Sequence, residues 1–339
     1  MSTYSPLRWG FLGCGSIANR LGADVSKLSD HKIQAIASRD PEKAAKYAVK
    51  FDVPTQHTGP DAYTKLVNDP EIDIVYVATP HNFHREQVLL ALNAGKHVLC
   101  EKPLALSRAE AQQLVEVRDR MGVQIGEAFM VRAHPQWAAV RELIAEGRIG
   151  ELRLVAGHFS YFRRDPNDIR SRLDWGGGAL MDIGCYPITL SRWLFGEEPD
   201  HVIAVLDRDP DTYVDRLASA LLRFPSGQAS FTCATQLVPY EVMQVLGTEG
   251  RIEVEIPFNA LADHECRLFI DDGRQFAGAG AETITLPAVD HYRLQGERFS
   301  EAVRGVGAVP VSLEDAIGNM SVIDALFESA RSGRWEQPE

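Results

Sequence analysis

The sequence predicts an α/β protein: a doubly wound parallel sheet, followed by an α+β region with a large, mostly antiparallel sheet. Short apolar runs alternate with helical patterns from residue 7 to about residue 127, which is typical of a parallel sheet. A glycine-rich turn follows the first of these runs. After residue 128, extended segments follow one another with few helices between them, which indicates antiparallel pairing. We therefore expect two domains, residues 1–127 and 128–339.

The composition limits the class of protein. The chain has 339 residues, 45% of them hydrophobic, which suits a globular protein with a large core. Its formal net charge of −12 argues against nucleic acid or an anionic membrane as the main partner, because both require a basic face. The 5 cysteines form no C-x-x-C pair, and neither a signal peptide nor a membrane-spanning run is recognised. We expect a cytoplasmic protein.

The first apolar run, Leu7 to Leu12, leads directly into Gly13-Cys14-Gly15-Ser16-Ile17-Ala18. This is the dinucleotide-binding fingerprint with alanine in its last position. Gly13 permits a tight turn, and Gly15 lets the backbone approach a pyrophosphate. The following helix then offers free N–H groups to the phosphates. A plain tight turn is the alternative, but a strand before the glycines and a helix after them favour the cofactor site.

The second run, Lys32 to Ala37, ends in Ser38-Arg39-Asp40, about 20 residues beyond the glycines. An acidic residue here binds the ribose hydroxyls of NAD, whereas the side chains of Ser38 and Arg39 suit a 2′-phosphate. We therefore expect NADP as the cofactor, with NAD possible and with Lys43 adding charge. Asp40 on the ribose is the alternative, but Asp40-Pro41 has the pattern of a helix N-cap followed by proline.

Two further runs end in polar segments. Ile72 to Ala78 leads into Thr79-Pro80-His81-Asn82-Phe83-His84, which we interpret as a loop that lines the cofactor or caps the next helix. We expect no metal there, because no third ligand has a recognisable spacing. The run His97 to Cys100 ends in Glu101-Lys102-Pro103. Ligands bind at the carboxyl ends of parallel strands, so Lys102 is a candidate for chemistry; a solvated surface lysine is the alternative.

The second half contains one informative segment. Trp175 is followed by three glycines, then by Asp182 and Tyr186, which are four residues apart and share one face of a helix. This pair suits a polyol pocket; a capping aspartate and a packing tyrosine are the alternative. A final amphipathic helix is predicted over 312–330. The predicted strands of this half are 151–162, 201–207, 217–224, 228–236, 241–247, 251–256, 267–270 and 283–286.

Together these features resemble the glucose–fructose oxidoreductase, inositol dehydrogenase and rhizopine-catabolism (Gfo/Idh/MocA) family. The resemblance implies a Rossmann domain that binds NAD(P) and a second domain for the substrate, a sugar or polyol. It also implies a homodimer or homotetramer formed through the second sheet. Inositol dehydrogenase-like members of the family have histidine at the position of Tyr186. With tyrosine there, this chain resembles the branch that contains NADP-dependent aldose 1-dehydrogenases and dimeric dihydrodiol dehydrogenase. The matching stretches are Gly13 to Ala18, Ala78 to His84, Glu101 to Pro103, Gly126 to His134 and Gly176 to Tyr186.

The resemblance implies hydride transfer between the nicotinamide and C1 of an aldose such as D-xylose or D-glucose. Tyr186 would be the general acid/base, Lys102 would favour its phenolate or bind the reacting oxygen, and Asp182 would hold a neighbouring hydroxyl or orient Lys102. Weaker candidates for the pocket wall are Phe162, Arg163 and Trp175. The residues expected to bind the cofactor are Gly13, Gly15, Ser16, Ile17, Ser38, Arg39, Lys43, Thr79, Pro80, Asn82, His84, Glu101, Lys102 and Pro103.

Two other functions remain open at this point. A trans-dihydrodiol or dicarbonyl oxidoreductase would use the same residues, and only its substrates would distinguish it. A sugar- or nucleotide-binding regulator without catalysis belongs to a different class. The presence of Lys102, Asp182 and Tyr186 together argues against the regulator, because a sensor does not need a proton relay.

Overall fold

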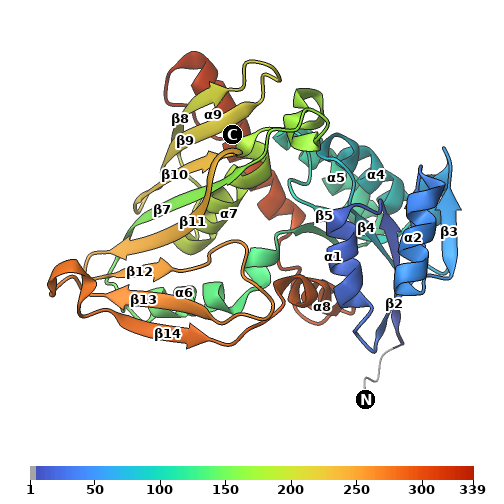
Figure 1. The fold of residues 1–339 in the computed structure, drawn as a ribbon, viewed down its shortest axis with the longest axis horizontal. Helices are drawn as coiled ribbons and strands as arrows, with labels where there is room; N and C mark the ends of the chain where they lie inside the picture. The colour runs from blue at the N-terminus through green and yellow to red at the C-terminus, as the bar shows by residue number, and fades with distance from the viewer. Residues whose placement is uncertain (1–4) are drawn as a thin grey trace. The chain divides into compact units, whose positions relative to one another are not determined.

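The computed structural model describes residues 5–339, except for the side chain of Ala277, and the chain forms two compact units (Figure 1). The first comprises the chain up to Ala133 together with Tyr292–Ile317, and the second comprises His134–His291 together with Gly318–Glu339. The division into domains 1–127 and 128–339 stays a prediction. The units differ from it mainly in the segment 292–317, which is counted with the first unit.

The first unit is built on a parallel sheet of six strands in the order β3-β2-β1-β4-β5-β6. The order reverses between β1 and β4, which confirms the predicted doubly wound sheet and puts its switch point at their carboxyl ends. The strand β3 was missed, because its sequence TQHT has no apolar run. The strands are β1 (Leu7–Leu12), β2 (His31–Ser38), β3 (Thr55–Thr58), β4 (Ile74–Val77), β5 (His97–Glu101) and β6 (Ile125–Ala128).

Helices cover both faces of this sheet, which is why its strands are apolar on both sides. Ile74 and Tyr76 of β4 belong to the core that includes residues of α1 and α2, whereas Val75 and Val77 belong to the core with α3, α4 and α5. The helices of this part are α1 (Ser16–Val25), α2 (Pro41–Phe51), α3 (Ala62–Val67), α4 (His84–Asn93), α5 (Arg108–Met121) and α8 (His291–Val303).

The segment 292–317 completes the first unit along β6. The amide of Glu127 donates to the carbonyl of Val311 at 3.0 Å. Phe299 of α8 is fully buried in the core with α1 and α2. A Cβ at Gly126 would come within 3.0 Å of the Phe299 ring, so glycine allows the segment to pack directly on the strand.

The second unit contains eight strands in the order β14-β13-β12-β11-β7-β10-β9-β8. All eight predicted strands are present, and β9 and β10 pair in antiparallel orientation. One pairing, between β7 and β10, is parallel. The strands are β7 (Leu152–Phe162), β8 (His201–Arg208), β9 (Asp215–Arg223), β10 (Gln228–Ala234), β11 (Gln236–Gly247), β12 (Arg251–Val254), β13 (Cys266–Asp271) and β14 (Glu282–Leu286).

Three further helices are α6 (Pro135–Ala145), α7 (Cys185–Phe195) and α9 (Leu313–Ser332). The last of these confirms the helix predicted over 312–330. Within the described part of the chain, no helix combines the length and the apolarity that crossing a membrane requires.

Candidate active site

The turn after β1 needs its glycines for two different reasons. Gly13 has a φ of +93°, and a Cβ there would lie 2.7 Å from the carbonyl oxygen of Ala78 at the end of β4. Gly15 is the N-cap of α1, and a Cβ there would meet no atom within 4 Å. Among the described residues, no side chain caps α1. The space at Gly15 and the free helix N-terminus fit the pyrophosphate of a dinucleotide.

The residues predicted for the 2′-phosphate lie around the end of β2. The hydroxyl of Ser38 accepts a hydrogen bond from the amide of Asp40 at 3.1 Å. Asp40 caps α2 through the amides of Glu42 and Lys43, which confirms its predicted structural role. The ammonium of Lys43 lies 3.6 Å from the Asp40 carboxylate, so part of its charge is already compensated. The cofactor contacts of Ser38 and Lys43 stay predictions.

The loop after β4 is fixed by His84. Its Nδ1 lies 2.8 Å from the carbonyl oxygen of Pro103, and its Nε2 lies 2.8 Å from that of Thr79. The hydroxyl of Thr79 donates to Gln87 at 2.7 Å. The buried Oδ1 of Asn82 accepts no hydrogen bond from the described residues. A hydrogen-bond donor on a bound cofactor would satisfy this acceptor.

Lys102 directly follows the last residue of β5, as predicted. The preceding Glu101 is buried and accepts a hydrogen bond from the hydroxyl of Tyr76. Burial raises the pKa of Glu101 to about 7, although Tyr76 and the charge of Lys102 oppose this change. The side chain of Glu101 is therefore engaged inside the sheet. Its predicted contact with the cofactor, like that of Pro80, stays a prediction.

In the second unit, the glycines before Asp182 have distinct structural roles. Gly176 and Gly178 have φ values of +74° and +113°. A Cβ at Gly177 would lie 2.5 Å from the carbonyl oxygen of Arg170, and one at Gly178 would collide with the carboxylate of Asp215. The groups that approach these glycines closely therefore belong to the same unit.

The helix that follows differs from the expected one. Leu180–Gly184 is a π-helical turn, and regular helix begins only with α7. Asp182 therefore lies in the π turn and Tyr186 in α7, rather than on one regular helical face. Pro187 is the third residue of α7, within the first turn of the regular helix. The amide of Leu180 donates to Asp215 of β9 at 2.6 Å, which holds the start of the π turn.

Asp182 is 4% exposed, and two side chains of the same unit donate hydrogen bonds to its carboxylate. The hydroxyl of Tyr161 donates to its Oδ2 at 2.5 Å, and Nε of Arg170 donates to the same oxygen at 2.9 Å. The charge of Asp182 raises the pKa of Arg170 above its usual range. Arg170 also lies 3.3 Å from Asp168. Tyr161 and Arg170 were not predicted as site residues from the sequence, because neither stands in a recognisable motif.

Tyr186 is 5% exposed and its ring packs in an aromatic cluster. The ring centroids of Phe159 and Phe258 each lie 5.7 Å from that of Tyr186, and these two rings stack on one another at 4.6 Å. The cluster fixes the plane of the phenol, which suits a group that must present its hydroxyl in one direction.

The weaker candidates lie in other surroundings. Phe162 ends β7 and is exposed. Nε of Arg163 lies 2.6 Å from Asp168, and the Trp175 ring lies 4.8 Å below the guanidinium of Arg172. Their contacts with substrate stay predictions, as do the catalytic roles of Lys102, Asp182 and Tyr186.

Comparison with known proteins defines the class and then the family. Residues 7–129 match an oxidoreductase family with an NAD-binding Rossmann fold, and residues 137–253 match the GFO/IDH/MocA C-terminal domain. The chain belongs to the Gfo/Idh/MocA family of oxidoreductases, as the resemblance predicts. The protein is therefore an enzyme of a family whose named relatives are dehydrogenases acting on hydroxyl groups.

Three similar proteins illustrate the range of the family. The chain is 36% identical over 254 residues, 74% of each chain, to a trans-1,2-dihydrobenzene-1,2-diol dehydrogenase from Mus musculus. It is 33% identical over 330 residues to D-xylose 1-dehydrogenase (NADP(+)) 2 from Haloferax volcanii, which is 96% of this chain and 98% of that one. The fold aligns with a TM-score of 0.88 to a 3-ketoreductase from Actinomadura kijaniata in complex with NADP and TDP-benzene, at 31% identity and with 96% and 98% of the two chains covered.

Proposed function

We propose that this protein is an NADP-dependent dehydrogenase that acts on C1 of an aldose such as D-xylose or D-glucose. The observation that carries this proposal is the buried carboxylate of Asp182, which Tyr161 and Arg170 fix one turn before Tyr186. A fixed carboxylate is a strong acceptor for a sugar hydroxyl, and the aromatic cluster around Tyr186 suits the apolar face of a sugar ring. The similarity to the D-xylose 1-dehydrogenase of Haloferax volcanii supports this substrate class.

The residues would share the chemistry as follows. When bound, the nicotinamide supplies the acceptor or donor of the hydride. Tyr186 takes the proton of the reacting hydroxyl during oxidation and returns it during reduction. Lys102 stabilises negative charge on the reacting oxygen or on the phenol, and Asp182 accepts a hydrogen bond from a neighbouring hydroxyl.

The preference for NADP is supported by the first unit. Gly15 and the free N-terminus of α1 have room for the pyrophosphate, and Arg39 at the end of β2 offers a cation to a 2′-phosphate. Asp40, the acidic residue next to it, is engaged as a helix cap. Two relatives support the same assignment. The Haloferax volcanii protein is named as an NADP(+) enzyme, and the Actinomadura kijaniata structure is a complex with NADP.

A panel of substrates tests the proposal. Aldoses, polyols, trans-dihydrodiols and dicarbonyls are each offered with NADP(H) and NAD(H), and turnover is followed by nicotinamide absorbance. We expect aldoses with NADP to give the highest kcat/KM. Tyr186→Phe should lower kcat by about 10²- to 10⁴-fold, and Lys102→Ala by a similar factor. The exposed Tyr213 provides the matched control, because Tyr213→Phe should keep full activity.

A trans-dihydrodiol or dicarbonyl oxidoreductase is the second candidate, supported by the similarity to the dihydrodiol dehydrogenase from Mus musculus. Activity with dihydrodiols at a kcat/KM above that of every aldose would favour it over the first candidate. Near-native turnover by Tyr186→Phe would contradict the acid/base role under both candidates. The regulator hypothesis has no such support among the named relatives.

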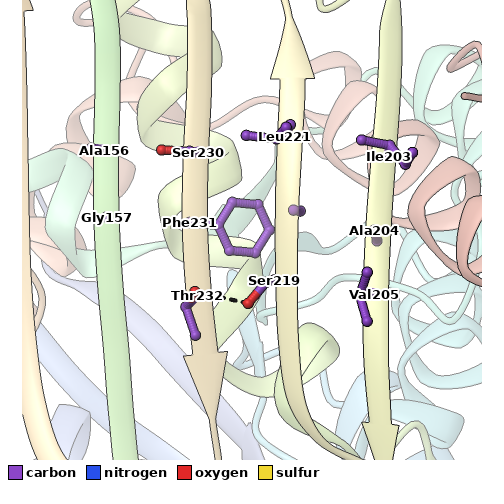
Figure 2. A pocket seen from close by; sticks show the side chains of 11 residues that line it. Ala156, Gly157, Ile203, Ala204, Val205, Ser219, Leu221, Ser230, Phe231 and Thr232 are labelled. Carbon is purple, nitrogen blue, oxygen red and sulfur yellow. Dashed lines mark hydrogen bonds between the residues drawn. The ribbon is translucent and has the colours of Figure 1, made fainter.

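We also propose that the protein forms a homodimer or homotetramer through the open face of the second sheet. Figure 2 shows this face over β8, β9 and β10, where Val205 and Leu221 are 73% and 47% exposed. On the same face, the hydroxyls of Ser219 on β9 and Thr232 on β10 lie 2.9 Å apart. An apolar surface of this kind on a regular sheet favours self-association. Leu221→Asp should shift the mass measured by light scattering towards the monomer.

A further inference from the structure

We propose that Phe83 and Tyr63 make Arg39 a selective site for the 2′-phosphate of NADP, because they hold its guanidinium in place before the cofactor binds. This inference rests on the NADP preference proposed above. It assigns a role to two aromatic residues that lie outside the glycine-rich fingerprint. Phe83 belongs to the short 3-10 turn before α4, and Tyr63 to the first turn of α3.

Arg39 is a cation whose charge is not compensated by an acid. It follows the last residue of β2, and its side chain is exposed. Within residues 5–339, no carboxylate forms an ion pair with it. Lys43, by contrast, lies 3.6 Å from Asp40. A phosphate that binds Arg39 therefore displaces no carboxylate. It forms charge-assisted hydrogen bonds with the guanidinium directly.

Phe83 lies against the guanidinium. The Cζ atom of Arg39 is 5.2 Å from the centre of the Phe83 ring, which is within the range of a cation–π contact. The amide of Phe83 donates to the carbonyl of Pro80 at 3.0 Å, and the next residue is the buried His84. The backbone on both sides of Phe83 is thus tied to the end of β4, so the ring is a fixed surface for Arg39.

Tyr63 interacts with Arg39 from the neighbouring helix. Its ring packs against the core with α3, α4 and α5. Burial raises the pKa of Tyr63, whereas the nearby positive charge of Arg39 acts in the opposite direction. The phenol is therefore a neutral partner at neutral pH. A neutral phenol does not compensate the charge of Arg39, so that positive charge stays available to a phosphate.

The contacts explain how selectivity arises. An arginine that is already oriented loses less conformational freedom on binding phosphate than one that rotates freely. NAD has a hydroxyl in place of the phosphate and gains little from the ordered charge. A cation–π contact at an exposed site accounts for about a two- to fivefold change in affinity. Loss of Phe83 or Tyr63 should therefore weaken NADP binding by about this factor and leave NAD binding unchanged.

Fragments of the cofactor test the inference without catalysis. The full chain is titrated by calorimetry with adenosine 2′,5′-bisphosphate and with adenosine 5′-monophosphate, and the ratio of the two affinities is compared among variants. We expect the wild type to prefer the bisphosphate at least tenfold, at about 1.4 kcal/mol per factor of ten. Arg39→Ala should bring the ratio close to one. Phe83→Leu and Tyr63→Phe should each lower it by about two- to fivefold, with the monophosphate affinity unchanged.

The outcomes separate the two proposals. A wild-type ratio near one would overturn the NADP preference itself. A high wild-type ratio that survives in both Phe83→Leu and Tyr63→Phe would overturn the present inference and leave the NADP preference standing. Tyr63→Phe removes only a hydroxyl, so it keeps the test available if Phe83→Leu folds poorly. Phe276→Leu, which alters a ring that is 96% exposed in the second unit, should leave the ratio unchanged.

Discussion

The imidazole of His84 lies 2.8 Å from the carbonyl oxygen of Pro103, and its other nitrogen lies 2.8 Å from the carbonyl of Thr79. Burial and the charge of Lys102 lower the pKa of His84, while the two carbonyl acceptors favour its protonated form. Thr79 follows the end of β4, and Pro103 follows Lys102. One buried side chain therefore links the cofactor loop to the backbone that carries the proposed catalytic lysine.

Replacement of this ring should destabilise the first unit. His84→Ala removes two hydrogen bonds and leaves a cavity, so we expect the free energy of unfolding to fall by about 3 kcal/mol. Urea denaturation followed by fluorescence measures the change. His264 is exposed, and His264→Ala should have no effect. Equal stability of the two variants would show that the His84 contacts contribute nothing.

Two glycines in the same turn should respond in opposite ways to alanine. Gly13→Ala meets a positive φ and a carbonyl 2.7 Å away, so it should destabilise the protein by about 1–3 kcal/mol. Gly15→Ala finds no atom within 4 Å and an ordinary φ, so it should fold with unchanged or slightly raised stability.

The same pair tests the pyrophosphate site. A Cβ at Gly15 occupies the space assigned to the phosphates, so Gly15→Ala should weaken NADP binding by tenfold or more in a fluorescence titration. Unchanged affinity together with unchanged stability would place the pyrophosphate elsewhere.

The ion pair of Arg170 with Asp182 should be needed for both folding and substrate binding. Arg170→Met removes a cationic donor from the buried carboxylate of Asp182, so we expect the free energy of unfolding to fall by about 3–5 kcal/mol. Adding Asp182→Asn removes that charge and should restore part of the stability, which a double-mutant cycle measures.

Substrate kinetics give the second readout for this pair. If Asp182 holds a sugar hydroxyl, Arg170→Lys should raise KM for the aldose by tenfold or more and change kcat less, because the charge is kept and the geometry is lost. An unchanged KM in Arg170→Lys would mean that the pair serves the fold alone.

Asp215 should make stability depend on pH. Burial raises the pKa of Asp215 to about 6, from an ordinary value of 3.8, although the amides of Leu180 and Ala179 oppose this change. Because the folded protein binds this proton more tightly than the unfolded chain, the contribution of Asp215 to stability is largest below about pH 4 and is lost as the pH rises through 6.

Asp215→Asn carries no charge at any pH and still accepts a hydrogen bond. The difference in the free energy of unfolding between this variant and the wild type should grow by about 3 kcal/mol from pH 4 to pH 7. This follows from about 1.4 kcal/mol per pH unit over the interval between the ordinary pKa of 3.8 and the raised pKa of about 6. Urea denaturation at several pH values measures the difference, with the exposed Asp263→Asn as control. A difference that does not vary with pH would contradict the prediction.

Much of the fold could be predicted because its strands are local apolar runs. The alternation up to residue 127 predicts the doubly wound sheet, and β3 was missed because it has no such run. The strands β7 to β14 were recognised by pattern, but no local pattern reveals that β7 pairs with β10 in parallel. Pairing partners depend on contacts between distant residues, which composition and spacing do not encode.

The site shows the same contrast between positions marked by a local pattern and contacts between distant residues. Gly13 and Lys102 lie at strand ends that the sequence marks with glycine or proline, so their positions could be predicted. Tyr161 contacts Asp182 across 21 residues, and Asp215 contacts Leu180 across 35. Such partners come from separate elements, and each looks like an ordinary polar residue in its own segment.

The closing of the first sheet by residues 292–317 has a consequence for how the chain folds during synthesis. The ring of Phe299 lies 6.4 Å from that of Trp9 on β1, and the edge strand β6 bonds to Val311. The ribosome makes the whole second sheet before these residues leave the exit tunnel. Until then the nascent cofactor-binding unit exposes an apolar edge, so a chaperone that binds such edges would act on it late in translation.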